Sequence, residues 1–131
     1  MKRYLEKNLN NNNIKYLGLV SREIMNNLLT TSDLVILPST YKTECQPLAL
    51  IEAMFFGINI ITTNTNALRT TIGEYPAIFT NRSVNDLENR LVYSYNKRFS
   101  NLIGSYDVLK VRKRFSEENF FLILKKMFEV D

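Results

Sequence analysis

The chain has 131 residues, the size of one domain, and its 45% hydrophobic and 23% charged residues are ordinary for a globular protein. It has one cysteine, Cys45, and no histidine, which excludes an intramolecular disulfide, a His/Cys metal cluster and a His-based catalytic triad. The net charge of +4 is modest for a nucleic-acid-binding protein, so we expect no nucleic-acid partner.

Apolar and basic runs set the expected location. The longest apolar run, PLALIEAMFFG, contains a carboxylate and falls short of the ~20 residues that span a bilayer, and the N-terminal residues have no apolar signal core. We therefore expect a cytoplasmic protein. The basic run VLKVRKRF is typical of a solvated helix face, and a patch for an anionic partner is the alternative. A peripheral position at the inner face of the membrane is thus a second expectation.

Short β-rich runs alternate with helical runs through the first half of the chain. The Asn-rich residues 1–13 predict the tail of a helix followed by a loop. IKYLGLV, SREIMNNLLTTS, DLVILPS, PLALIEAMFFG and INIITTN then predict strand, helix, strand, helix and strand. LVIL and INII are unbroken apolar runs, as expected of a parallel sheet covered on both faces. The alternation predicts an α/β fold.

The second half predicts one short strand, AIFTN, and three closing helices. Ser83 with Asp86 is a start signal for the first of these helices, and Ser116 is one for the last. The last helix carries an apolar stripe that predicts a packing face, with a membrane-lying or partner-docking face as the alternative: Phe120, Phe121, Leu124, Met127 and Phe128.

Two carboxylates, Glu44 and Glu52, flank the start of the apolar helix. Pro47 fits the first helical position, so the helix begins at the carboxyl end of a parallel strand, where open α/β sheets bind ligands. The free amides of Leu48 and Ala49 would then suit a phosphate. A buried glutamate costs several kcal/mol unless it is paired. The simpler interpretation places Glu52 on a thin solvated edge and Glu44 on a surface loop.

The functional interpretation is that both carboxylates accept hydrogen bonds from hydroxyl groups while the amides between them hold a diphosphate. A ligand with sugar hydroxyls on both sides of a diphosphate is a nucleotide sugar. Ribose hydroxyls would then satisfy Glu52. An internal partner, such as a Lys or Tyr, is the alternative.

The sequence also resembles a known family. NIKYLGLV, DLVILPSTYKTECQPLALIEAMFFGINIITTN and RKRFSEENF are similar to the C-terminal half of the family 4 glycosyltransferases, which have the GT-B fold. The resemblance implies a Rossmann-like parallel sheet, retention without a metal, no cofactor, and a UDP- or GDP-linked donor. A hexose-type sugar would pass to a glycan or lipid-linked acceptor, as in polysaccharide biosynthesis.

Carried over from that family, the donor-site roles fall on one stretch of this chain. The resemblance implies contacts to the donor sugar, the diphosphate and the ribose, respectively, from three sets of residues: Glu44, Cys45 and Gln46; Leu48 and Ala49; and Glu52. Pro47 has no N–H, so one amide often used by relatives is absent.

Two features depart from the family pattern. Asn66 and Ala67 stand where relatives have a Gly-Gly turn, and Thr70 replaces a glutamate; a reshaped or degraded ligand loop and an ordinary turn are both open. The N-terminal domain and the first two strands of this domain are also missing, and with them the Arg and Lys that neutralise the donor diphosphate. The missing strands would lie between IKYLG and DLVIL.

We therefore expect residues 1–131 to form a single, incomplete donor-binding domain that does not transfer sugar alone. A shorter rejoined sheet, a partner chain that supplies the missing half, and a poorly folding gene remnant are the three outcomes. The rival hypotheses are a non-catalytic nucleotide-sugar-binding or interaction subunit, an epimerase of the same GT-B shape, and a flavodoxin-like interaction protein without a ligand.

Overall fold

The computed structural model describes residues 14–41, 43–81, 83–97 and 108–128, and they form an α/β structure. The three strands of its single sheet are β1 (Leu34–Leu37), β2 (Asn59–Thr63) and β3 (Ala77–Thr80). The helices are α2 (Arg22–Thr31), α3 (Leu48–Phe55), α4 (Asn66–Ile72), α5 (Val84–Asn96), α6 (Val108–Arg114) and α7 (Glu117–Phe128). No helix in this described part of the chain is long and apolar enough to cross a membrane.

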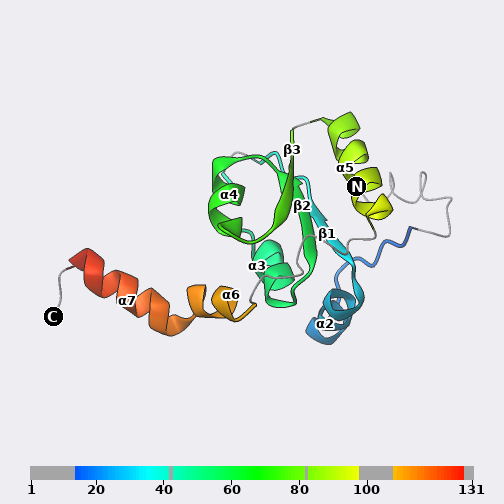
Figure 1. Ribbon diagram of the computed structural model, residues 1–131. Coiled ribbons are helices and arrows are strands. Elements are labelled where there is room, and N and C mark those ends of the chain that lie inside the picture. Colours follow the sequence, from blue (N-terminus) through cyan, green and yellow to red (C-terminus); the bar gives the residue numbers. More distant parts are fainter. Residues whose placement is uncertain (1–13, 42, 82, 98–107, 129–131) are drawn as a thin grey trace.

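The sheet is parallel, with β2 between β1 and β3. Two consecutive crossovers in the same direction, both of the usual right-handed kind, place α3 and α4 on one face of the sheet. Figure 1 shows α5 on the opposite side, where it contacts β3. The predicted alternation of strands and helices from β1 onward is confirmed, and so is the short last strand.

The main core lies between the sheet and the helices α3 and α4. Leu50 and Met54 of α3 meet Ile60 of β2 and Ile72 of α4, and each of these four side chains is fully buried. Burial of an aliphatic side chain of this size contributes about 1.5–3 kcal/mol, so this layer holds the sheet to its helices. Tyr75 closes the same core and donates its hydroxyl hydrogen bond to the carbonyl oxygen of Ile58 at 2.7 Å.

The first predicted strand is wrong: residues 14–20 contain no strand. Ile14 and Tyr16 are more than half exposed and Leu19 is fully exposed. Isolated strands gain too little to form, and within the described residues β1 pairs only with β2. The predicted DLVIL strand is therefore an edge strand rather than a strand buried on both faces, and Ile36 is 42% exposed. The prediction of full burial is confirmed for β2.

The closing helices begin where their caps predict. The Ser83 hydroxyl accepts a hydrogen bond from the Asp86 amide at 3.4 Å, and the Ser116 hydroxyl accepts one from the Asn119 amide at 3.2 Å. The packing face predicted for α7 is wrong, however. In Figure 1 this helix runs away from the sheet, and its largest apolar side chains in that stripe are exposed: Phe120, Phe121 and Met127.

Candidate functional site

The start of α3 forms the floor of the candidate site. Pro47 is the N-cap of α3, one position earlier than predicted, and its carbonyl oxygen accepts from the amides of Leu50 at 3.1 Å and Ile51 at 3.5 Å. The preceding amides, of Leu48 and Ala49, donate no hydrogen bond within the described residues. No acidic side chain lies in the first turn. The positive end of this helix is therefore open to an anion.

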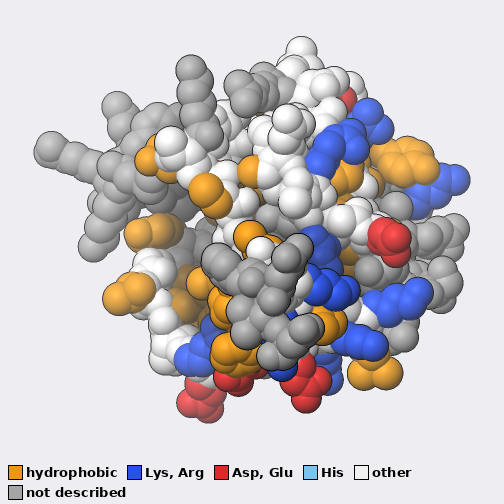
Figure 2. All heavy atoms as spheres, turned by 90° about the vertical axis from the view of Figure 1, so that its left-hand side faces the viewer, with side chains coloured by type: hydrophobic (Ala, Val, Ile, Leu, Met, Phe, Trp, Pro, Cys, Tyr) orange, Lys and Arg blue, Asp and Glu red, His pale blue; other side chains and the backbone are white. Residues whose placement is uncertain are grey.

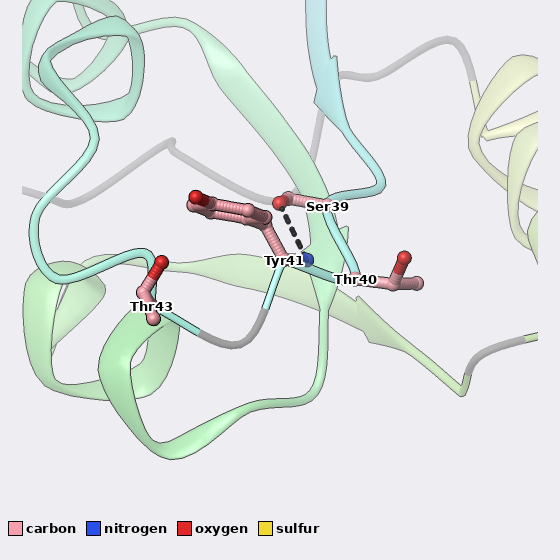
Figure 3. Close-up of a pocket in the computed structure, with 4 residues that line it drawn as sticks. All are labelled: Ser39, Thr40, Tyr41 and Thr43. Atoms are coloured by element: carbon pink, nitrogen blue, oxygen red, sulfur yellow. Dashed lines mark hydrogen bonds between the residues drawn. The ribbon is translucent and has the colours of Figure 1, made fainter.

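The loop between β1 and α3 encloses an open hollow of about 590 Å³. Ser39, Thr40, Tyr41 and Thr43 line it (Figure 3). The Ser39 hydroxyl accepts a hydrogen bond from the Tyr41 amide at 3.3 Å, which turns the chain immediately after β1. Figure 3 shows Tyr41 and Thr43 directed to one side of the loop and Thr40 to the other. The hollow thus presents hydroxyl groups and one exposed aromatic ring.

Glu44 follows this hollow and has an unsatisfied oxygen. Its side chain is partly buried, and its Oε2 atom is buried without a hydrogen-bond partner among the described residues. The Glu44 amide donates to the carbonyl oxygen of Tyr41 at 3.5 Å, which holds the residue at the end of the turn. A buried carboxylate oxygen that accepts no hydrogen bond is costly, so a donor from outside this chain would be favourable there.

Cys45 and Gln46 lie between Glu44 and the helix start, and both are exposed. The Cys45 thiol donates only a long contact, 3.5 Å, to the carbonyl oxygen of Thr43. Gln46 faces a separate hollow of about 320 Å³ that it shares with Arg114 and Asn119. The two hollows have no lining residue in common, so the structure does not gather all the predicted sugar-binding residues at one hollow.

Glu52 has an internal partner. Its Oε1 atom accepts a hydrogen bond and ion pair from the Arg22 guanidinium of α2. The Glu52 side chain is 24% exposed and that of Arg22 is 68% exposed, so the pair lies at the edge of the core. The Oε2 atom has no hydrogen bond to a described residue. The alternative of an internal partner is thus realised by an arginine, where the sequence suggested a Lys or Tyr.

Asn66, Ala67 and Thr70 form part of α4 rather than a ligand loop or an ordinary turn. The hydroxyl of Thr65 caps this helix by accepting a hydrogen bond from the Leu68 amide at 3.3 Å. Asn66 and Ala67 therefore have right-handed helical conformations, in which alanine is unstrained. The Thr70 hydroxyl donates back to the carbonyl oxygen of Asn66 at 2.8 Å. The prediction of a turn is wrong because the cap at Thr65 was not recognised.

Sequence reasoning also missed a group of hydroxyls at the carboxyl ends of the strands. Thr40, Thr63, Thr80 and Ser83 line a second hollow of about 290 Å³ beside the loop. Each follows or ends a predicted strand, and that position was the available signal. Thr40 lines both this hollow and the loop hollow.

Two comparisons with known proteins bear on this site. A family model described as glycosyl transferases group 1 matches residues 1–120, which include every described residue of the loop and of α3. A search of curated proteins finds no match.

Proposed function

The chain belongs to the group 1 glycosyltransferases, and from that membership we propose that its β1–α3 loop and the start of α3 bind a nucleotide-sugar donor. Membership in family 4 within that group is part of the proposal. So are a UDP- or GDP-linked hexose donor, transfer with retention and without a metal, and a glycan or lipid-linked acceptor. We also propose that these 131 residues do not complete the reaction by themselves.

The buried oxygen of Glu44 is the observation that carries the proposal. Its Oε2 atom needs a hydrogen-bond donor and has none among the described residues. A sugar hydroxyl is a suitable donor, because a hydrogen bond to a carboxylate contributes about 1.5–3 kcal/mol, more than one between neutral groups. We therefore assign Glu44 to the donor sugar, with Cys45 and Gln46 following it in the same loop.

The diphosphate fits the helix start. The free amides of Leu48 and Ala49 can donate to phosphate oxygens, and the helix dipole favours negative charge there by about 0.3–1 kcal/mol at an exposed site. The missing first-turn acidic residue matters, since a carboxylate there would repel the diphosphate. This position also lies at the carboxyl end of a parallel strand, the usual ligand edge of such sheets.

Glu52 is assigned to the ribose, with Arg22 as its positioning residue. Arg22 occupies Oε1 and fixes the carboxylate, while Oε2 is left for one hydroxyl. One oxygen serves one ribose hydroxyl well, whereas a two-oxygen grip on both hydroxyls would require Arg22 to move. The ion pair therefore limits how Glu52 can hold a ribose.

Thermal melts with matched ligands test this assignment. UDP, GDP and their hexose conjugates are each added to the purified chain, and a ligand at 100 times its Kd should stabilise it by about 2.7 kcal/mol, a Tm rise of several degrees. Glu44→Gln should remove the advantage of the sugar conjugate over the bare diphosphate nucleotide. Glu52→Gln should reduce the shift from the nucleotide and leave the smaller shift from pyrophosphate.

Glu88→Gln, an exposed glutamate of α5, is the control and should behave as the unchanged chain does. A chain that melts cooperatively and is moved by none of these nucleotides would refute the proposed donor site. Equal nucleotide-sugar preference in Glu44→Gln would remove Glu44 from it.

A further inference from the structure

A second hollow lies where all three strands end, apart from the start of α3. Its volume is about 290 Å³, and it takes lining residues from the ends of β1, β2 and β3 and from the first turn of α5. The register of the sheet pairs Thr63 with Thr80, so these two side chains stand next to each other on the same face. Polar groups from segments far apart in the sequence therefore converge on one space.

Thr63 is the unusual member of this group. Only 2% of the residue is exposed, it lines the hollow, and its hydroxyl forms no hydrogen bond with any described residue. The neighbouring Thr80 hydroxyl makes one long bond, 3.4 Å, to the carbonyl oxygen of Thr62. Buried hydroxyl groups are rarely left unpaired, because the loss of water is not repaid. A ligand hydroxyl in the hollow would supply the missing bond.

The start of α5 does not favour an anion in this hollow. Asp86 lies in the first turn of α5, where its Oδ2 atom accepts the Asn81 amide at 2.6 Å. Its own amide donates to Ser83. The carboxylate thus already occupies the positive end of the helix, and a second negative charge would be repelled. The ligand class that remains is neutral.

The rest of the hollow is apolar, with Pro38, Val84 and Leu87 among its lining residues. A sugar ring matches such a surface, because its C–H face is apolar and its rim carries hydroxyl groups. The volume is at the lower end of small-molecule sites, about 300–1,000 Å³, which suits one ring rather than a dinucleotide.

We propose that this hollow binds a single neutral sugar ring, free or at the end of a glycan, through the hydroxyls of Thr63 and Thr80. The site is separate from the proposed diphosphate position and does not depend on nucleotide binding. For a ligand of about 13 heavy atoms, ordinary efficiency gives a Kd of about 1 mM.

Methyl-group NMR tests the proposal directly. The full chain, labelled at Thr, Val and Leu methyl groups, is titrated with the methyl α-glycosides of glucose, mannose and galactose, and with the corresponding α-linked disaccharides. At least one glycoside should shift the methyl resonances of Thr63, Thr80 and Leu87 together. A disaccharide that binds several times more tightly than its methyl glycoside would indicate the end of a glycan as the natural source, and equal binding would indicate a free sugar.

Two threonine variants on adjacent positions of β2 sharpen the test. Thr63→Val removes the unpaired hydroxyl with little change of shape, so it should weaken glycoside binding about fivefold and leave thermal stability unchanged or higher. Thr62→Val is the matched control. Its hydroxyl points to the other face and donates to the carbonyl oxygen of Leu37 at 2.9 Å, so the variant should lose stability and keep glycoside affinity. If Thr62→Val does not fold, Thr71→Val replaces it, since that hydroxyl bonds Ala67 within α4.

Three results would overturn the proposal. The first is the lack of any shift in these methyl groups at ten times the expected Kd. The second is equal glycoside affinity in Thr63→Val and the unchanged chain. The third is a shift of the same methyl groups by pyrophosphate and not by glycosides, which would assign the hollow to an anion.

Discussion

A single ion pair explains how a carboxylate is tolerated in the most apolar helix of this protein. Glu52 belongs to α3, in which Leu50, Ala53 and Met54 are fully buried, yet its own side chain keeps 24% exposure and reaches Arg22. The arginine comes from α2, thirty positions earlier in the chain. At this scale, the cost of a buried charge is avoided by placing the charge at the edge of the core and pairing it.

The first prediction concerns this pair. Because Arg22 is 68% exposed, the pair should contribute little to folding, and Arg22→Met should lower the unfolding free energy by less than about 1 kcal/mol. Urea unfolding of Arg22→Met, Glu52→Gln and the double variant gives their coupling energy. Arg22→Met should nevertheless reduce the thermal shift from the nucleotide that binds, because Glu52 loses its positioning partner. A coupling well above 2 kcal/mol would show a structural ion pair and count against the ribose role.

The end of α4 shows how one element secures another. Arg114, at the end of α6, donates hydrogen bonds to the carbonyl oxygens of Thr70, of Thr71 at 2.9 Å and of Ile72 at 3.2 Å. These carbonyls have no partner within their own helix, so the guanidinium satisfies the end of α4. Gly73 follows with φ of +61° and leaves room for it.

The second prediction compares two glycines with similar backbone angles. A Cβ atom at Gly73 would overlap the Arg114 guanidinium, whereas at Gly18, with φ of +65°, the nearest atom belongs to Tyr16 at 3.9 Å. Gly18→Ala should cost about 1 kcal/mol, from left-handed strain alone. Gly73→Ala should cost about 2–4 kcal/mol, because it also displaces the arginine from the helix end. Chemical denaturation measures both, and equal costs would mean that Arg114 does not secure α4.

On the scale of the whole molecule, the described residues end in a helix that adds little to the core. Figure 2, viewed from the side on which α7 lies in Figure 1, shows hydrophobic side chains at the surface with Lys and Arg side chains beside them. Residues of α7 supply exposed apolar groups, including Phe121 and Ile123, and its last turn carries Lys125 and Lys126. The preceding α6 does join the core, through the buried Val111.

The third prediction follows from this contrast. Ending the chain after Ser116 removes α7 and should lower the unfolding free energy by less than about 1 kcal/mol, since α7 has no buried residue among those described. Val111→Ala should cost more, about 1–2.5 kcal/mol, because it empties part of the core beside α3. Thermal and urea unfolding of both variants check the order. A larger loss on removal of α7 would mean that its apolar face is covered in solution.

The sequence by itself determined the features that depend on neighbouring residues. The parallel α/β alternation, the buried central strand and the caps at Ser83 and Ser116 follow from periodicity and local hydrogen bonds. The start of α3 at the end of a strand was also predictable to within one residue. The positions of Glu44 and of the free amides follow from it, whereas their role is still a prediction.

Only the tertiary structure decided the features that join distant segments. The Arg22 partner of Glu52, the Arg114 bonds at the end of α4 and the hollow around Thr63 each bring together residues from separate elements. Residues 14–20 have the apolar pattern of a strand, but a strand forms only where a neighbour offers its backbone hydrogen bonds. In each case the energy comes from groups far apart in the chain, so the local pattern could not specify the outcome.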